Sequence, residues 1–289
     1  MLKRGPRSAS RRNRLRMASV FLAFALLLVL FYIPGYWYVR GVTRQNALEY
    51  YRQRLLDGAK ALDVTLSGLG NLQEMLNQNP LTRALGYPSS RTDMTAVDKV
   101  RDAVRIYLLP YAMAADAGLS RGEEILFTRR RVYHPREQLQ AVHYFRSEGL
   151  TTAQWLSKLS GPVSVLPEEA FRTVDYGAYR GFTVAWRWSR ANDMYLFATF
   201  PTDKVFSLIA DEGVLAAGHA AIAWGGRVIA SSGASPAGAY EDLSAKADSL
   251  ELEFSLRIPD AYIEQDLRQL HRLALSFLGV LVLASAVWV

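Results

Sequence analysis

The sequence predicts an α+β fold: a long membrane-proximal helix, then two units built on antiparallel sheets, with a transmembrane helix at each end. Three observations lead to this prediction. An uncharged run at residues 17–39 is long enough to cross a bilayer, and a second uncharged run closes the chain. Leucines recur every seven residues after the first run, as in a long amphipathic helix. Short alternating segments separated by turn residues then indicate antiparallel strands.

The first membrane helix is expected at residues 17–39. As a helix, this run reaches about 34 Å, which exceeds the roughly 30 Å of a hydrocarbon core. Residues 1–16 carry seven Lys and Arg and no acidic residue. Under the positive-inside rule, this basic tail stays in the cytoplasm and the chain from Arg40 onward lies outside. A cleaved signal peptide is the alternative, but the run is longer than the apolar segment of an ordinary signal peptide, and its end (YWYV) lacks a small-x-small cleavage site.

Outside the basic tail the charges balance. The chain has 34 Lys and Arg and 27 Asp and Glu, so subtracting the seven basic residues of the tail leaves 27 of each sign. A nucleic-acid-binding body would be expected to have a basic surplus. The chain also has no cysteine, which excludes disulfides and cysteine-ligated metals.

Two helices are predicted next, over about residues 41–85 and 92–107. The first carries a seven-residue repeat of Leu48, Leu55, Leu62, Leu69 and Leu76. A sustained repeat favours pairing with a second helix, so we expect a homodimer; packing against the helix's own domain is the alternative. Asn79-Pro80 predicts a break in this helix, and Asp93 is a candidate cap for the second one.

Strands and two further helices are expected in the rest of the body. Strands are predicted at residues 108–115, 124–133, 182–189, 194–200, 220–224, 227–231 and 249–258. The strands at 182–189 and 194–200 form a hairpin, and those at 220–224 and 227–231 form another around Gly225-Gly226. Helices are predicted at 202–215 and 259–272. The body therefore divides into a distal unit over about 92–201 and a proximal unit over about 202–260.

The second uncharged run occupies residues 273–289. A membrane helix normally needs about twenty residues and an interfacial anchor, and this run has seventeen residues with no basic flank after it. We therefore expect a second transmembrane helix that is truncated at the chain end. The chain is then a fragment of a two-pass membrane protein whose residues 40–272 lie outside the cell.

This layout resembles the double Cache (dCache) sensor region of bacterial membrane receptors over about residues 41–272. Four stretches carry the resemblance: LDVTLSGLGNLQEMLNQNPLTRAL, EEILFTRRRVY followed by HYF, WLSKLSGPVSVLP and AIAWGGRVIASSG. The last stretch looks like the strand-turn-strand that opens many Cache and PAS-like units. Among receptors, the layout is most similar to membrane-bound AraC-type transcription regulators and, next, to sensor histidine kinases.

The resemblance implies a fold of two PAS-like antiparallel-sheet units and a role in signal transduction. A small polar ligand such as a sugar, or a solute-binding protein, would bind outside and shift the two membrane-connected helices. The output domain would follow residue 289. An AraC-type output would contact DNA only through that missing C-terminal domain, and a histidine kinase or chemoreceptor output is the alternative.

Basic and aromatic side chains supply the candidate ligand-binding residues. On a strand, Arg129 and Arg131 share a face and suit an anion; a solvated edge strand is the alternative. Aromatic faces with polar tips suit a sugar, although core packing explains the same residues. Tyr179 belongs to the same aromatic group. The candidate ligand-binding residues are Arg129, Arg131, Tyr133, Tyr144, Trp155, Tyr176, Trp186 and Trp188.

No catalytic or metal-binding pattern is present in the sequence. His134 and His143 are nine positions apart, which matches no usual metal-ligand spacing. There is no G-x-S-x-G, phosphate-loop or H-E-x-x-H pattern. We therefore expect neither an enzyme nor a cofactor or metal. From another class, the alternative function is a membrane-tethered extracytoplasmic enzyme or scaffold.

Overall fold

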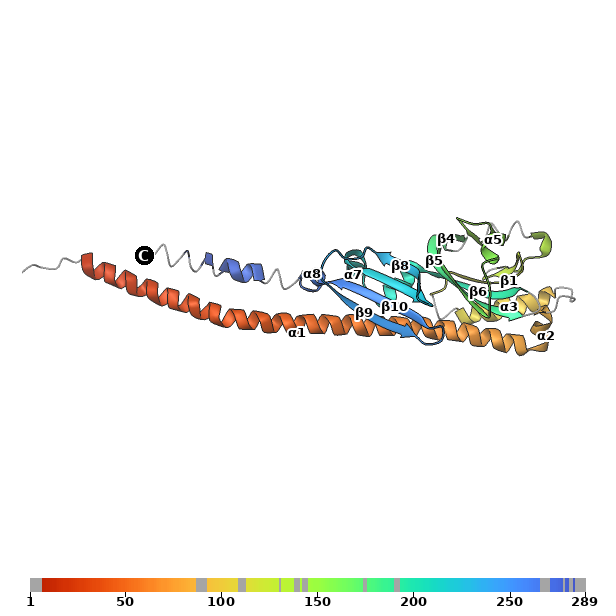
Figure 1. The fold of residues 1–289 in the computed structure, drawn as a ribbon, viewed down its shortest axis with the longest axis horizontal. Coiled ribbons are helices and arrows are strands. Elements are labelled where there is room, and N and C mark those ends of the chain that lie inside the picture. The colour runs from red at the N-terminus through yellow and green to blue at the C-terminus, as the bar shows by residue number, and fades with distance from the viewer. Residues whose placement is uncertain are drawn as a thin grey trace, which may run out of the picture. The chain divides into compact units, whose positions relative to one another are not determined.

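The computed structural model describes residues 7–86, 93–108, 113–129, 131–137, 141, 145–173, 176–189, 193–265, 271–277, 279–280 and 283. It divides into two units. We call Tyr51–Ile258 the sheet unit, and we call Met1–Tyr50 together with Pro259–Val289 the terminal unit. Figure 1 labels the helices and strands of both units.

Helix α1 (Arg7–Gln78) contains both the predicted membrane segment and the predicted helix after it. Pro34 lies inside α1 without ending it, as is common in membrane helices. The break predicted at Asn79-Pro80 is confirmed, because α1 ends at Gln78 and α2 (Pro80–Arg83) and η1 (Ala84–Gly86) follow.

Four of the five leucines in the α1 repeat are buried inside the sheet unit; Leu48, which precedes that unit, is half-buried. Leu55 and Leu62 are 0% exposed, Leu69 is 1% exposed and Leu76 is 9% exposed. These side chains cannot form a seam with a second copy, so the expected pairing through this stripe is wrong over Leu55 to Leu76. The helix packs on its own unit instead: Arg54 donates hydrogen bonds to the carbonyl oxygens of Ser207 and Ala210.

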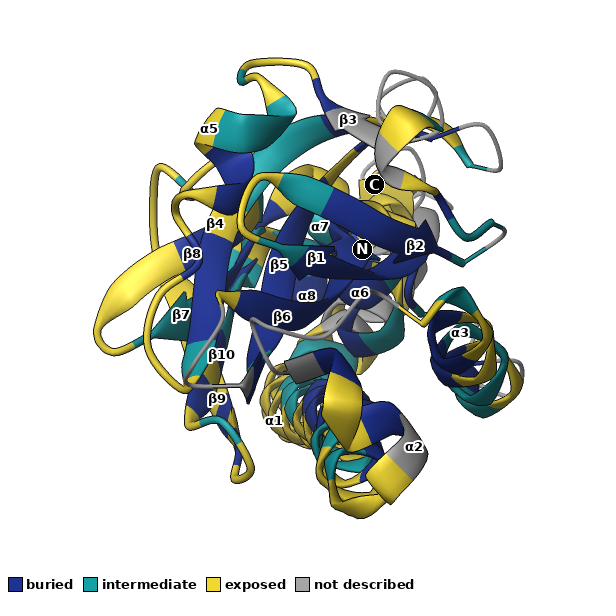
Figure 2. Ribbon diagram, turned by 90° about the vertical axis from the view of Figure 1, so that its right-hand side faces the viewer, coloured by how far each residue is buried: buried dark blue, intermediate teal, exposed yellow. Residues whose placement is uncertain are grey.

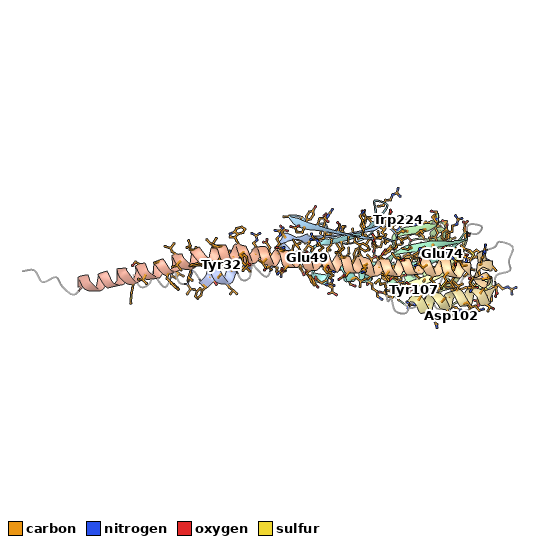
Figure 3. The ribbon with its side chains drawn as sticks, turned by 90° about the horizontal axis from the view of Figure 1, so that it is seen from below. Tyr32, Glu49, Glu74, Asp102, Tyr107 and Trp224 are labelled. Atoms are coloured by element: carbon orange, nitrogen blue, oxygen red, sulfur yellow. The ribbon has the colours of Figure 1, made fainter. Side chains whose placement is uncertain are left out.

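Helix α3 (Met94–Leu108) confirms the second predicted helix. Asp93 caps it by accepting a 2.9 Å hydrogen bond from the backbone N–H of Thr95. Tyr107 lies between α3 and α1, and its hydroxyl donates to the carbonyl oxygen of Val64 (Figure 3). Part of the strand predicted at 108–115 is wrong, because Leu108 ends α3 and residues 113–115 form no strand; residues 109–112 lie outside the described part of the chain. A short apolar run does not distinguish a strand from a buried helix end.

Six strands form the distal sheet, in the order β2-β1-β6-β5-β4-β3. They are β1 (Asp116–Arg121), β2 (Glu124–Thr128), β3 (Phe145–Ser147), β4 (Val163–Thr173), β5 (Gly177–Ser189) and β6 (Met194–Pro201). The antiparallel pairing of β5 with β6 confirms the first predicted hairpin. The strand predicted at 124–133 is too long, because Thr128 and Arg131 exchange two backbone hydrogen bonds in a turn.

The two faces of the distal sheet are covered differently (Figure 2). Helices α1 and α3 lie along one face, and α5 (Thr152–Leu156) lies over the other. A set of buried side chains, the distal cluster, fills the space on the α5 side. Its members are Ala115, Ile125, Tyr133, Ala141, Trp155, Leu156, Leu159, Leu166, Phe171, Tyr179, Ala185, Tyr195 and Phe197.

Four strands form the proximal sheet, in the order β8-β7-β10-β9. They are β7 (His219–Trp224), β8 (Arg227–Gly233), β9 (Tyr240–Ala247) and β10 (Leu252–Pro259). The second predicted hairpin is confirmed, and its turn residues Gly225 and Gly226 have φ values of 55° and 76°. The helix predicted at 202–215 is instead two helices, α6 (Thr202–Ile209) and α7 (Glu212–Ala217), because Asp211 caps α7 through the N–H of Val214.

The two sheets follow the same connection rule. In each, the first two strands form a hairpin at one edge, and the last strand lies beside the first strand in the interior of the sheet. This repeat of topology agrees with the two sheet units that the dCache resemblance implies. The strands of the two sheets do not repeat one another in sequence, so the hydrophobic periodicity of single strands could not reveal the repeated strand order.

The terminal unit joins the two ends of the chain by polar contacts. Arg40 of α1 pairs with Glu264 at 2.5 Å, and Arg44 pairs with Asp260 of α8 (Asp260–Ile263) at 3.1 Å. The Tyr32 hydroxyl lies 2.9 Å from Nδ1 of His271. Both ion pairs are partly exposed, so each contributes at most about 1 kcal/mol to stability.

Among the described residues, one helix is long and apolar enough to cross a membrane. It is the Leu26–Gln78 part of α1, with a mean hydropathy of 1.3 over its best window. Leu30 and Phe31 each expose 69% of their surface. The second predicted membrane helix, at 273–289, lies mostly outside the described residues.

Candidate functional site

The two candidate arginines do not share a strand face. Arg129 follows the end of β2, and its backbone N–H donates to Oδ1 of the buried Asp116 at 3.0 Å, which fixes the backbone there. Arg131 pairs with Glu137 at 3.5 Å, and its guanidinium lies 6.0 Å from the centre of the Tyr133 ring. The interpretation of a two-arginine grip on a strand is therefore wrong, because β2 stops at Thr128.

Three of the aromatic candidates lie in or against the distal cluster. Tyr133 and Trp155 are buried in it, and Tyr176 packs on it. Trp155 meets Phe171 and Phe197 edge-on, with ring centres 5.9 and 5.2 Å apart. Tyr133 and Trp155 are 0% and 1% exposed, so their rings contact protein in this structure.

The remaining candidates lie elsewhere. Trp186 is on the opposite side of β5 from the distal cluster, near Gly70 of α1, where an added Cβ would lie 3.1 Å from the indole Nε1. Trp188 is 1% exposed and is not a member of the cluster. Tyr144 lies outside the described residues. The structure thus does not gather the eight candidates into one site, and their role in binding stays a prediction.

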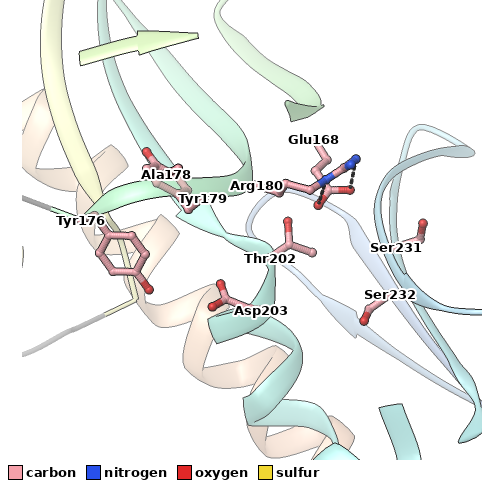
Figure 4. A pocket seen from close by; sticks show the side chains of 9 residues that line it. All are labelled: Glu168, Tyr176, Ala178, Tyr179, Arg180, Thr202, Asp203, Ser231 and Ser232. Carbon is pink, nitrogen blue, oxygen red and sulfur yellow. Dashed lines mark hydrogen bonds and ion pairs between the residues drawn. The ribbon is translucent and has the colours of Figure 1, made fainter. Parts of the chain in front are cut away.

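A pocket of about 600 Å³ opens where the distal sheet, α6 and β8 meet (Figure 4). This volume suits a small molecule. Of the eight candidate residues from the sequence, Tyr176 is among those that line it. The lining consists of Glu168, Tyr176, Ala178, Tyr179, Arg180, Thr202, Asp203, Ser231 and Ser232.

Local sequence positions each part of this pocket. Gly177 has a φ of 76°, which turns the chain between β4 and β5 and places Tyr176 beside Tyr179, with ring centres 5.2 Å apart. Pro201 ends β6 and immediately precedes α6, so Thr202 and Asp203 are the first two residues of that helix. Ser231 and Ser232 come from β8 of the proximal sheet.

Charges around the pocket are arranged in pairs. Arg180 donates to both oxygens of Glu168, at 3.2 and 3.3 Å. The Lys204 ammonium lies 4.7 Å from the centre of the Tyr176 ring. Burial, and then the Asp203 carboxylate, raise the pKa of Tyr176 above its ordinary 10.0. The Tyr176 hydroxyl therefore keeps its proton at neutral pH and remains a hydrogen-bond donor.

Tyr179 belongs both to the lining of the pocket and to the distal cluster. Its hydroxyl lies 2.7 Å from Oγ1 of Thr199. Burial is the main cause that raises the pKa of Tyr179 far above 10, and the nearby Asp116 carboxylate adds to it. Tyr179 is thus a neutral hydrogen-bonding group in the lining of the pocket.

The sequence did not identify most of the residues that line the pocket as candidate binding residues. Glu168 and Arg180 belong to the consecutive strands β4 and β5, of which β4 was not predicted, and Ser231 comes from β8 of the other sheet. Tyr176 and Tyr179 were recognised as aromatic residues of a possible binding surface. One sequence feature could have pointed to Thr202 and Asp203. Pro201 precedes them and marks the junction between a strand and a helix.

The pocket residues do not form a recognisable catalytic set. Within the part of the chain that the structure describes, no group of three or more His, Asp or Glu could hold a metal ion. The pocket instead offers hydroxyls, carboxylates and one guanidinium around an aromatic wall, which are groups that bind a polar molecule through hydrogen bonds.

Comparison with known proteins finds similarity only among solved structures. No family matches the chain, and no curated protein matches it. An extracellular domain assigned to a histidine kinase is 12% identical, with a TM-score of 0.44, covering 78% of this chain and 98% of that one. The sensory domain of the Campylobacter jejuni chemoreceptor Tlp3, with isoleucine bound, is 11% identical, with a TM-score of 0.41 and coverages of 78% and 98%. The ligand-binding domain of the Pseudomonas aeruginosa amino acid chemoreceptor PctB, in complex with L-Arg, is 10% identical, with a TM-score of 0.40 and coverages of 75% and 96%.

Proposed function

We propose that this chain is the ligand-sensing portion of a membrane receptor. The observation that carries the proposal is that α1 combines a membrane-length segment and a packed segment in one helix. One uninterrupted helix contains an apolar segment long enough to span a membrane and the leucine stripe that forms the core of the sheet unit. A displacement of the packed part of such a helix reaches the apolar part without a flexible linker.

The pocket beside α6 supplies the second requirement of a sensor, a place for the ligand. A ligand shifts a conformational equilibrium only if it binds one state better than the other. The pocket is lined by β5 of the distal sheet and β8 of the proximal sheet, so a ligand there contacts both sheets at once. The affinity of the ligand then depends on how the two sheets pack against each other. A ligand of this kind binds one packing arrangement better than another, as signalling requires.

The proposed ligand is a small polar solute such as a sugar; a solute-binding protein that delivers it is the second candidate. The proposed topology has two membrane passes, a cytoplasmic N-terminus and residues 40–272 outside. Arg40–Glu264 and Arg44–Asp260 support this topology, because they bring together segments that precede and follow the sheet unit in the sequence. The apolar segment of α1 would contact membrane lipid.

An AraC-type DNA-binding domain is the proposed output, and a histidine kinase or chemoreceptor output is equally compatible with the sheet unit. DNA would be a partner only through that domain. A homodimer remains part of the proposal, but it must use a surface other than the buried leucines of α1. The chain itself is proposed to be non-catalytic.

The sensor role predicts that binding changes the spacing of the two membrane-connected segments. Because the chain has no cysteine, Gln45→Cys and Ala261→Cys introduce a unique pair of spin labels, one in α1 and one in α8. In full chain reconstituted in nanodiscs, a solute that binds should shift the distance distribution between the labels. A membrane-tethered enzyme, the runner-up, would convert the solute and leave the distribution unchanged. Binding without any shift would contradict the sensor role.

A further inference from the structure

We infer that the N-terminal end of α6 is the specificity-determining part of the pocket, and that it selects a neutral, polyhydroxylated molecule of about monosaccharide size. The inference rests on the proposed sensor role and deepens it by naming the part of the pocket that selects the ligand and the charge and size of ligand that it accepts. Four features of the pocket support it: an unpartnered hydroxyl, an uncapped helix, a balance of charges and a high density of hydroxyl groups.

The unpartnered hydroxyl belongs to Thr202. This residue is only 5% exposed, and it lines the pocket. Among the described residues, its Oγ1 is buried and has no hydrogen-bond partner. A buried hydroxyl without a partner costs about 1–3 kcal/mol, so a ligand that supplies a partner recovers this cost. Figure 4 shows Thr202 between Asp203 and the two serines.

The helix that begins at Thr202 lacks a side-chain cap. Its N-cap residue is Pro201, which makes no side-chain hydrogen bond to the helix. The first N–H groups of a helix have no acceptor within the helix, and they attract electron-rich atoms. A ligand oxygen at this end of α6 would therefore accept from backbone N–H groups while it also contacts the Thr202 hydroxyl.

The charges around the pocket disfavour a ligand with net charge. Glu168 and Arg180 already neutralise each other, and Lys204 lies on the ring of Tyr176 close to Asp203 in the sequence. Two carboxylates and two cations thus surround the pocket. Because the two signs balance, neither an added anion nor an added cation gains net attraction from these side chains to offset the cost of removing its charge from water.

Hydroxyl groups are the most numerous polar groups in the pocket lining once Glu168 and Arg180 are counted as an ion pair. Tyr176, Thr202, Ser231 and Ser232 can each donate and accept one or more hydrogen bonds. Carboxylate oxygens only accept, and helix N–H groups only donate. A molecule with several adjacent hydroxyls matches this mixture, because each of its hydroxyls can donate to one group and accept from another.

Thr202→Val tests the role of the hydroxyl, and Thr183→Val is its matched control. Valine has nearly the same shape as threonine and removes only the hydroxyl function. Thr183 in β5 is also fully buried with an unpartnered Oγ1, but it does not line the pocket. Because each variant removes an unsatisfied buried group, the melting temperature of both should equal or exceed that of the unchanged chain.

Binding is measured by calorimetry on the full chain in nanodiscs. The neutral probes are D-glucose, maltose and myo-inositol. The charged probes are L-arginine and succinate, which carry net charge, and L-valine, which is a zwitterion with two charged groups and no net charge. We expect at least one neutral probe to bind, Thr202→Val to weaken it about tenfold and Thr183→Val to leave its affinity unchanged.

The other outcomes separate this inference from the sensor role. If only charged probes bind, the ligand class is wrong and the sensor role stands. The assignment of Thr202 fails if both variants weaken binding equally, or if Thr202→Val lowers the melting temperature and leaves the affinity unchanged. If no probe of either class binds, the inference is overturned, and the sensor role then depends on the label-distance measurement with other solutes.

Discussion

Replacing Leu62 by aspartate is expected to lower the free energy of unfolding of the sheet unit by about 4 kcal/mol or more. Leu62 is 0% exposed at the centre of the buried stripe of α1. The substitution removes a buried apolar side chain and places an unpaired carboxylate in its position, which is among the most destabilising changes a core can undergo. Chemical denaturation of the full chain in nanodiscs, followed by tryptophan fluorescence, measures the loss.

Val64→Asp is the matched control for this substitution. Val64 is two residues away in the same helix and is 44% exposed. Valine and aspartate have similar helix propensities, so the control should change stability by only about 0.5 kcal/mol. Equal effects of the two substitutions would contradict the burial of the stripe.

The same pair of variants separates internal packing from a seam between copies. If Leu62 packed against a second chain, Leu62→Asp would yield folded monomers, and its effect would depend on protein concentration. The structure predicts loss of folding at every concentration, because the neighbours of Leu62 belong to its own chain.

Replacing Gly233 by alanine is expected to destabilise the protein by about 2–5 kcal/mol. Gly233 ends β8 with a φ of 79°, a left-handed conformation that costs other residues about 1–2 kcal/mol. An added Cβ would also lie 2.8 Å from the carbonyl oxygen of Leu215, and it would overlap the carbonyl oxygen of Gly218. Both are backbone atoms at the end of α7, so relief requires movement of that helix, and overpacking of this kind costs about 1–3 kcal/mol.

Gly226→Ala separates these two causes. Gly226 has a φ of 76°, close to that of Gly233, but an added Cβ there would meet no atom within 4 Å. Its substitution should therefore cost only the conformational share, about 1–2 kcal/mol. Melting curves of the two variants give the difference, and a Gly226→Ala loss as large as that of Gly233→Ala would mean that the contact with α7 contributes nothing.

Patterns with a clear period predicted their elements well. The alternation of Leu252, Phe254, Leu256 and Ile258 predicted the buried face of β10, and all four side chains are 0% exposed. The Gly225-Gly226 turn predicted the β7–β8 hairpin. The heptad leucines predicted the helix correctly but not its partner, because an apolar stripe has the same spacing whether it faces its own sheets or a second chain.

Strands whose sequences lack a regular alternation of apolar and polar residues were not predicted. Strand β4 contains Pro167 and the charged Glu168 and Glu169, and its register shifts around them, so it carries no clean alternation. Strand β1 contains Gly118, where an added Cβ would lie 2.5 Å from both Phe127 O and the ring of Phe197. Close approach of backbone and ring fixes that glycine, and no local sequence pattern expresses such a contact.

The pocket was the least predictable part. Its walls come from β4, β5, α6 and β8, so it exists only after the two sheets have formed. Aromatic composition pointed to Tyr176, but the same reasoning selected Trp155 and Trp186, which the fold buries on opposite sides of the distal sheet. Composition identifies residues suited to binding, whereas the topology decides which of them reach a cavity.

Labelling of single cysteines in intact bacteria tests the central claim, that the chain is anchored with its sheet unit outside. Because the chain has no cysteine, Ser235→Cys in the exposed segment after β8 and Ser8→Cys in the basic tail each give one reactive site. With a membrane-impermeant maleimide, we expect Ser235→Cys to react in intact cells and Ser8→Cys to react only after permeabilisation, on a chain of uncleaved mass. The reverse pattern, or protection of both positions in intact cells, would contradict the account.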